Sequence, residues 1–341
     1  MQKLSEQTNQ MLLCSQKEVF DTLVPVGHSF RKLMEVVNLE KIVEPLRTLY
    51  SDLGTTGLDV EKGFKALLIQ FWEDYSDRQM EQALRENVAV KFFCGFGLTE
   101  QTPVHTYFTK LRARLGSKRL ADAFNTVNAQ LRNKGLYGDT FTFVDASSLI
   151  TKTALWEERD RAIADGEEKL NNAVVGKYAA DPDARWGAKG KDKIWFGYKR
   201  HASVDMRYGL IQKVCVTPAN VLDYQVMDQI CPDQGLVFMD KLYDTKGTDL
   251  VVRANGCTPA TIRKNTNKLK NKDLDAFHSK LRMPFEGTFS KCSKRTRYRG
   301  RPKVLFQVFA ESLVHNLKKA VKVLFSPQPT SAPSYGSSFQ G

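Results

Sequence analysis

The chain has 341 residues, 42% hydrophobic and 26% charged, the ordinary balance of a globular protein with about two or three domains. The first residues do not show the pattern of a signal peptide, and no apolar run approaches the roughly 20 residues that cross a bilayer, so neither a leader nor a membrane span is expected. The six cysteines form no C-x-x-C pair, which argues against a zinc site, a disulfide framework or an oxidising location. The net charge of +13 favours a polyanionic partner, usually nucleic acid.

The first third of the chain is expected to be helical. Apolar residues recur at helical spacing within 58–75. Ser76 and Gln79 form the pattern of a capping box, which predicts a second helix that runs on to a pair of glycines. A third, basic helix is expected over 105–116. These helices predict a compact domain over 1–135, and a scaffold is as good an interpretation of it as a DNA-binding unit.

The middle of the chain changes to strands that alternate with helices. A β-branched and aromatic strand is expected over 141–149, followed by a charged, partly helical connection over 157–193. The next expected elements are a β-hairpin of 194–205 and 210–218, a helix over 220–230, a strand over 236–240, a helix over 244–256 and a strand over 257–264.

The last part is expected to be helical again. A basic helical region over 274–300 precedes an amphipathic helix over 304–325. The Pro/Ser/Gly-rich tail, 326–341, is expected to be disordered. Strands, a hairpin and then strands interleaved with helices predict an α/β domain over 136–325 with a mixed sheet, an order that fits a ribonuclease H-like arrangement.

Two of the expected strands end in an aspartate. Asp145 follows FTFV and Asp240 follows LVFM, so both are expected at the edge of the sheet where α/β proteins place their sites. Glu286 belongs to the later helix, where neighbouring phenylalanines would hold it against the core. Three such carboxylates can hold two magnesium ions, and they suit this hard cation better than zinc.

Each acid taken alone also has a simpler structural interpretation. Asp145, which precedes two serines, and Asp240 could each cap a turn or a helix, and Glu286 could be a solvated helix residue. Spacing and charge do not choose uniquely among the acids of this region. The competing acids are Asp205, Asp223 and Asp244.

The segment 262–303 concentrates the positive charge. It carries 14 lysines and arginines against 3 acidic residues, a net charge of +11. A carboxylate in such a segment would hold metal beside a track for DNA phosphates, although a solvated basic helix is the alternative. Arg282 would share the helix face of Glu286. The candidate DNA-binding residues are Arg282, Lys291, Lys294, Arg295, Arg297 and Arg299.

Several stretches together resemble the DDE transposases of bacterial insertion sequences, in particular insertion sequence family five. They are residues 75–116, FVDASSL (143–149), 195–223, VFMDKLYD (237–244), RMPFEGTFSKCSKRTRYRG (282–300) and HNLKK (315–319), and the resemblance extends from about Gly57 to Lys318. Three positions depart from the family pattern. Leu242 replaces a glycine, Ser279 a tyrosine, and Ser293 a lysine, with Lys294 one residue further on.

The resemblance implies a ribonuclease H-like catalytic domain with Asp145, Asp240 and Glu286 as catalytic and metal-binding carboxylates. It implies two Mg²⁺ or Mn²⁺ ions, DNA as partner at terminal inverted repeats and at the target, a homodimer or higher assembly on DNA, and a place with the nucleoid in the bacterial cytoplasm, away from membranes. The expected activity is cleavage at the element's ends followed by strand transfer. A non-enzymatic DNA-binding protein and a nuclease of the same fold are the alternatives.

Charge and position also suggest a division of labour. The helix 105–116 carries three basic residues but no candidate metal ligand. We therefore expect the region 57–116 to hold the element's ends, in a dimer, while the segment 262–303 grips DNA beside the cut.

Overall fold

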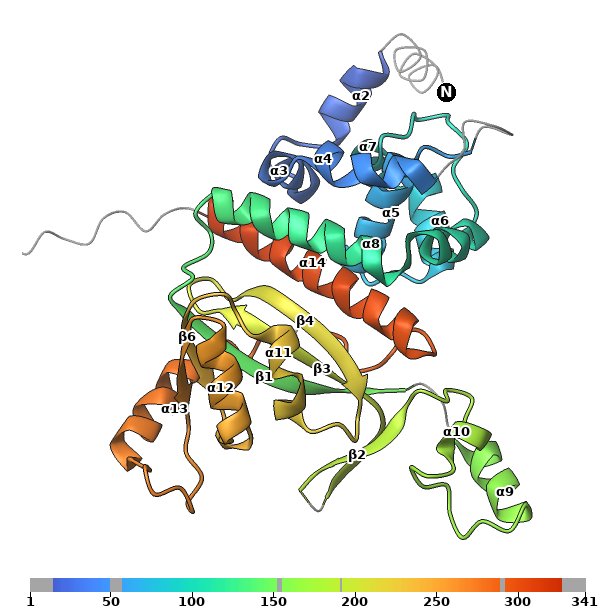
Figure 1. The fold of residues 1–341 in the computed structure, drawn as a ribbon. Coiled ribbons are helices and arrows are strands. Elements are labelled where there is room, and N and C mark those ends of the chain that lie inside the picture. Colours follow the sequence, from blue (N-terminus) through green and yellow to red (C-terminus); the bar gives the residue numbers. More distant parts are fainter. Residues whose placement is uncertain (1–14, 50–56, 152–154, 191, 289–291, 327–341) are drawn as a thin grey trace, which may run out of the picture.

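The computed structural model describes residues 15–49, 57–151, 155–190, 192–288 and 292–326. Helices form one layer over a six-stranded mixed sheet (Figure 1). The expected fold class is confirmed: an all-helical region precedes a mixed α/β, ribonuclease H-like domain. Apart from Ser326, the tail expected to be disordered lies outside the described residues. No helix in the described ranges has the length and apolar character needed to span a membrane.

The helical region packs around the buried face of α5. Its elements are α2 (Gln16–Leu23), α3 (Ser29–Val36), α4 (Leu39–Val43), the 3₁₀ helix η1 (Glu44–Leu49), α5 (Val60–Trp72), α6 (Asp77–Glu86), α7 (Val88–Cys94) and α8 (His105–Asn133). The capping box of Ser76 and Gln79 is present at the start of α6. The expected single helix is nevertheless two, because the Asn87 side chain accepts hydrogen bonds from the next backbone N–H groups, at 2.9 and 3.2 Å, and starts α7.

Helix α8 is longer than the basic helix expected from the sequence. Its first part stops at Gly116, as expected, because that residue has φ 62° and ψ 172° and interrupts the helix. A second part continues to Asn133 and buries Leu120, Phe124 and Leu131. These residues recur at helical spacing, so the signal was present in the sequence. The second part packs along α14 (Arg301–Phe325), and the two long helices lie side by side above the sheet (Figure 1).

The sheet has the order β2-β3-β1-β5-β6, with β4 paired to β3. Its strands are β1 (Phe141–Ile150), β2 (Arg185–Lys189), β3 (Lys193–Asp205), β4 (Leu210–Pro218), β5 (Gly235–Met239) and β6 (Cys257–Thr261). Strand β3 is antiparallel to β1 and β4, whereas β1, β5 and β6 are mutually parallel. The expected β3–β4 hairpin is therefore confirmed, and the parallel part carries the two aspartates that end expected strands.

The connections are shorter than expected. They comprise α9 (Trp156–Ala164), α10 (Val175–Tyr178), η2 (Asp223–Val226), α11 (Met227–Ile230), η3 (Lys241–Tyr243), α12 (Lys246–Ala254) and α13 (Lys272–Glu286). The expected helix 220–230 is thus the short pair η2 and α11. The basic helical region ends at α13, because Pro284 in its last turn lacks a backbone N–H and Gly287 follows. Pro302 then opens α14.

An apolar core covers each face of the sheet. On one face Phe143 and Leu149 of β1 join the core that α8 and α14 complete. On the other face Val144 packs with Val237 of β5 beneath α11 and α12. Because side chains alternate along a strand, Asp145 belongs to the face of Phe143, which α14 covers.

Candidate active site

Asp145 and Asp240 occupy equivalent positions on neighbouring parallel strands. Phe143 pairs with Phe238 at the end of the parallel β1–β5 ladder, and each aspartate stands two residues further on. Both acids therefore share one face and one edge of the sheet. Asp240 follows the last residue of β5, as expected, whereas Asp145 lies inside β1, which continues beyond β5 and pairs with β3 as far as Ile150.

The surroundings of Asp145 disfavour its ionised form. Burial is the main reason that the pKa of this carboxyl is raised to about 6, and the neighbouring charge of Asp240 acts in the same direction. A hydrogen bond of 2.8 Å from the Ala146 backbone N–H opposes this rise, as do the cations of Arg282 and Lys189. The two acids are thus close enough to repel each other, an arrangement typical of sites that bind a cation.

Asp240 caps the turn that follows β5. Its Oδ1 accepts a hydrogen bond of 2.8 Å from the Leu242 backbone N–H at the start of η3. This is the structural role considered for it as an alternative, but a carboxylate keeps further lone pairs for a ligand. The buried Tyr243 hydroxyl is within electrostatic reach of both acids and has no hydrogen-bond partner among the described residues. Nothing in the sequence pattern singled out Tyr243.

The end of α13 lies against the strand that carries Asp145. The Phe285 ring packs on Phe143, with 6.2 Å between ring centroids. Arg282, one turn earlier, is only 6% exposed and lowers the pKa of Asp145. Glu286 is the last residue of α13, so the helix brings its backbone to this edge; its side chain lies outside the described part of the structure.

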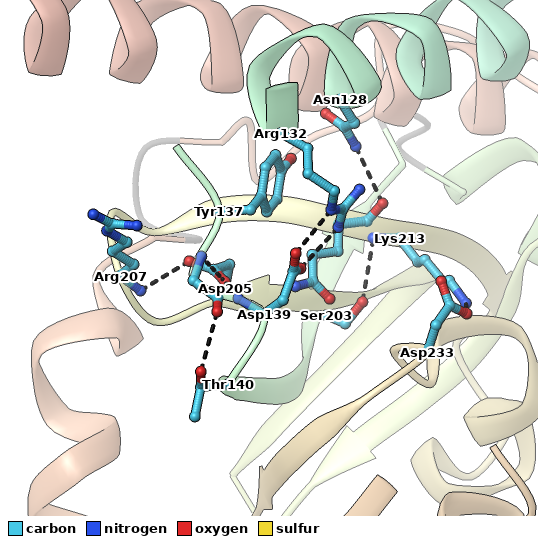
Figure 2. Close-up of polar contacts among 12 residues, drawn as sticks. Asn128, Arg132, Tyr137, Asp139, Thr140, Ser203, Asp205, Arg207, Lys213 and Asp233 are labelled. Atoms are coloured by element: carbon cyan, nitrogen blue, oxygen red, sulfur yellow. Dashed lines mark hydrogen bonds and ion pairs between the residues drawn. The ribbon is translucent and has the colours of Figure 1, made fainter. Parts of the chain in front are cut away.

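The three competing acids are engaged in structural contacts. Asp205 accepts three backbone hydrogen bonds of 2.9–3.0 Å at the β3–β4 turn (Figure 2). Asp223 forms an ion pair of 2.8 Å with Lys199, and Asp244 one of 2.7 Å with Arg263. These contacts leave Asp145 and Asp240 as the acids that face each other without an ion pair to a described side chain.

The donor set fits a hard divalent cation. Asp145 and Asp240 offer oxygen ligands, and their mutual repulsion would be relieved by a cation between them. Among the side chains that the structure describes, no three of His, Cys, Asp or Glu converge on one point. The third candidate ligand, Glu286, is not among those side chains.

The candidate DNA-binding residues have different surroundings. Arg282 is buried beside Asp145, and Lys291 lies outside the described residues. The remaining four, Lys294, Arg295, Arg297 and Arg299, belong to the segment between α13 and α14. The backbone of this segment forms hydrogen bonds with the backbone of Ile150 at the end of β1. Of these, Lys294, Arg295 and Arg299 are exposed.

Arg297 connects the two halves of the molecule. Its guanidinium forms an ion pair with Asp74, donates a hydrogen bond of 3.0 Å to the Tyr75 carbonyl and lies over the Phe71 ring at 4.7 Å. Arg112 of the expected basic helix is likewise paired, with Asp77 at 2.6 Å. Lys110 and Arg114 of that helix are exposed.

Lys189 is a further residue near the acids, and it was missed in the sequence. It ends β2, where the sequence suggested only a polar surface connection, and its charge acts on Asp145. The sequence signal that could have found it is the run KGKDK at 189–193, which places lysines on both sides of a tight turn.

The mixed sheet that follows an all-helical region is the arrangement of a ribonuclease H-like domain, and the register of β1 and β5 brings Asp145 and Asp240 to one edge of it. Residues 137–317, just over half of the chain, match the family model of the Transposase DDE domain, and residues 18–114 match that of a Transposase domain (DUF772). The chain belongs to the DDE transposase family and is a DNA transposase of a mobile element. No solved structure matches the chain, and membership of insertion sequence family five stays a prediction.

Proposed function

We propose that this transposase cuts DNA at the ends of an insertion sequence and joins the freed ends to target DNA, with Asp145, Asp240 and Glu286 as its metal-binding carboxylates. The observation that carries the proposal is the register of β1 and β5, which brings Asp145 and Asp240 together at one edge of the sheet. The packing of Phe285 on Phe143 supports the third position, because it anchors the end of α13 beside these strands.

The three carboxylates would hold two Mg²⁺ or Mn²⁺ ions. When bound, the ions supply the polarisation that makes a hydroxyl nucleophilic and the positive charge that stabilises the leaving oxygen. The charge of the buried Arg282 guanidinium favours the ionised form of the Asp145 carboxyl. The half-buried position of Asp145 also reduces the screening of these charges by bulk water.

The proposed chemistry has two displacement steps and no covalent enzyme intermediate. Water attacks the phosphorus at the element's end and gives up a proton to solvent, the P–O3′ bond breaks, and the leaving 3′ oxygen takes up a proton from solvent, which yields a 3′-hydroxyl and a 5′-phosphate. The freed 3′-hydroxyl then attacks a phosphodiester of the target, and the target's own 3′ oxygen leaves. The number of phosphodiester bonds is unchanged in the second step, so no external energy source is needed.

The helical region and the catalytic domain are proposed to divide the DNA contacts. We assign 1–135 to a helical domain, 136–325 to the catalytic domain and 326–341 to a tail. The region 57–116 would hold the element's ends in a homodimer or higher assembly, and 262–303 would grip DNA beside the cut. The exposed Lys110 and Arg114 support the first assignment. The bacterial chromosome in the cytoplasm would be the place of action.

Alanine substitution tests the three carboxylates. Asp145→Ala, Asp240→Ala and Glu286→Ala are each expected to abolish nicking of end-containing DNA with Mg²⁺ or Mn²⁺, and to leave DNA binding largely intact. Asp122→Ala, at an exposed position of α8, is the matched control and should keep full activity. Full activity of the Asp240 variant would overturn the assignment.

A joining assay separates a transposase from a nuclease of the same fold. Pre-cut element ends are supplied with a supercoiled target, so that the hydrolytic step is bypassed. A transposase joins these ends to the target, whereas a nuclease yields only nicked target. The ends can be read from inverted repeats in the DNA that flanks the reading frame.

A further inference from the structure

A groove of about 760 Å³ lies beside the two candidate acids and is lined by residues that follow them in the chain. Ala146 and Ser148 of β1, which follow Asp145, line it, as does Leu242, two residues after Asp240. By the alternation of side chains along β1, Ser147, which also lines the groove, shares the face of Asp145, whereas Ser148 points to the opposite face of the sheet. The groove therefore leads away from the acids around the same edge of the sheet, toward the β2–β3 hairpin.

The β2–β3 hairpin brings two positive charges to this groove. Lys189 and Lys193 are direct cross-strand partners, both are exposed, and both line the groove. Like charges directly opposite each other destabilise a hairpin. The charge of Lys189 reaches Asp145, but neither lysine forms an ion pair with any side chain that the structure describes, so an anion from outside the chain can bind both and relieve their repulsion.

The other charges of the groove leave it cationic. Its acid, Asp223, is already neutralised by Lys199 at 2.8 Å. The exposed Lys294 stands on the rim, and the Lys294 carbonyl accepts a hydrogen bond of 2.9 Å from the Ile150 backbone N–H at the end of β1. This bond fixes the backbone of Lys294 beside the strand that carries Asp145.

Apolar side chains lie among these cations. Trp195 shares the hairpin face of Lys193, and Leu222 and Leu242 are 51% and 46% exposed at the groove. Single-stranded nucleic acid binds where phosphates meet cations and the faces of the bases meet side chains on which they can stack. Trp195 is only 6% exposed, so the exposed leucines offer the apolar surface for a base here. The volume is that of a pocket for a drug-sized ligand, so it suits a nucleotide or two of one strand rather than a duplex.

We propose that this groove holds an unpaired DNA strand next to the scissile phosphodiester, with Lys189 and Lys193 on its phosphates and Leu242 against a base. The inference rests on the proposed function, because it takes the edge at Asp145 and Asp240 as the place of cutting. The strand comes either from the element's own end or from the target, and both present the same chemistry to the groove.

Single-strand binding tests the groove without any cleavage. The full chain is titrated with fluorescent dT12 over a series of KCl concentrations. Lys189→Gln/Lys193→Gln should weaken binding roughly tenfold near 0.1 M salt and lower the salt slope by roughly 1.4, which corresponds to two phosphates on a single strand. Leu242→Ala should weaken dT12 binding about threefold with the slope unchanged, because removing an apolar surface from beneath a base releases no counterions.

A second pair of lysines provides the matched control. Lys169 and Lys322 are both exposed, do not line the groove and lie outside the segments assigned to DNA, so Lys169→Gln/Lys322→Gln should leave both the affinity and the slope for dT12 near the unaltered values. If the two double variants bind dT12 alike, the groove does not hold the strand and the inference is overturned, whatever the outcome with the Asp145 and Asp240 variants.

Activity assays then identify the source of the strand. If Lys189→Gln/Lys193→Gln loses cleavage of the element's ends, the groove holds the element's own strand. If it cleaves normally but fails to join pre-cut ends, the groove holds the target strand. Unchanged rates in both assays would overturn the inference, while loss of cleavage in Asp145→Ala would still uphold the proposed function.

Discussion

At the scale of single residues, burial and the charge of Asp240 both act against an ionised Asp145. Its folded-state pKa of about 6 lies above the ordinary value of 3.8. Between these pH values the folded chain binds more protons than the unfolded chain, so the free energy of unfolding falls as pH rises from about 4 to 6. The protein thus holds this acid in a conformation that costs stability at neutral pH.

The variant Asp145→Asn should remove this cost. Above pH 7, with a chelator present, we expect its free energy of unfolding to exceed that of the unaltered chain by about 2–3 kcal/mol. Near pH 4 the two proteins should be equal. Urea unfolding at both pH values measures this, with Asp122→Asn as the exposed control. Equal stability of the Asp145 variant and the unaltered chain at pH 7.5 would contradict the prediction.

The basic residues near α14 should separate into two kinds. Arg295 and Arg299 are exposed, and their change to glutamine should lower the salt slope of duplex binding by roughly one unit for each phosphate that is no longer neutralised. The Arg297 guanidinium already binds the Asp74 carboxylate and the Tyr75 carbonyl. Arg297→Gln should therefore leave the salt slope unchanged, and it should speed proteolysis of the helical region because it removes contacts that hold this region to the catalytic domain. A slope that falls with Arg297→Gln would assign this residue to DNA.

For the candidate site, the sequence pointed to residues but not to their partners. Asp145 and Asp240 were candidates because each follows an apolar run, and their role as metal ligands stays a prediction, while Asp145 lies inside β1 rather than at its end. The competing Asp223 and Asp244 could not be set aside, since their cations, Lys199 and Arg263, come from other elements. Lys189 was missed for the same reason: its nearness to Asp145 exists only in the folded sheet.

At the scale of elements, strand β3 depends on a close approach to β1. A Cβ at Gly197, where φ is 154°, would lie 2.1 Å from the Leu149 carbonyl oxygen. This oxygen belongs to the backbone, which cannot move aside without breaking the β1–β3 ladder that continues to Asp145. Close packing of the two strands at this point therefore requires glycine.

Gly197→Ala should consequently be destabilising. We expect a loss of roughly 2 kcal/mol or more in the free energy of unfolding, measured by urea unfolding. Gly176 in α10 has open space around its Cβ position, so Gly176→Ala is the matched control and should be neutral or slightly stabilising. Equal stability of the two variants would show that the strands can separate at Gly197 without cost.

Element boundaries were predictable where one residue type fixes the backbone. The capping box at Ser76 and the stop at Gly116 are of this kind. The break at Asn87 was missed, because asparagine is compatible with a helix interior and its capping role depends on backbone geometry. The end of α13 was also missed, although Pro284 provided a signal.

At the scale of the whole molecule, α14 is held to α8 and β4 by a buried polar network. Asn316 Oδ1 accepts a hydrogen bond of 2.8 Å from Ile211 N, and its Nδ2 donates to the Ile211 carbonyl and to Asn128 Oδ1 at 2.7 and 2.8 Å. Asn128 itself donates hydrogen bonds of 3.1 and 3.2 Å to the carbonyls of Ile211 and Gln212, and Figure 2 shows it reaching down from α8 to β4. One side chain thereby fixes the helical layer on the sheet.

Asn316→Ala should weaken this junction. It leaves the Ile211 N–H and the Asn128 side-chain oxygen buried without partners, at roughly 1–3 kcal/mol each. We expect a loss of roughly 2–5 kcal/mol in the free energy of unfolding, measured by urea unfolding. Asn255→Ala, which removes an exposed asparagine at the end of α12, is the control. A loss below that of the control would show that water replaces the missing side chain.

The position of α14 has a consequence for synthesis of the protein. This helix, residues Arg301–Phe325, is the last regular element of the described chain to leave the ribosome, yet it fills the space between the helices made first and the sheet made after them. Until α14 has been synthesised, the apolar surfaces of α8 and β4 that it covers are exposed to solvent. A frameshift or premature stop ahead of Arg301 would therefore yield neither a separate DNA-binding half nor a catalytic half, but an aggregating chain that proteases remove.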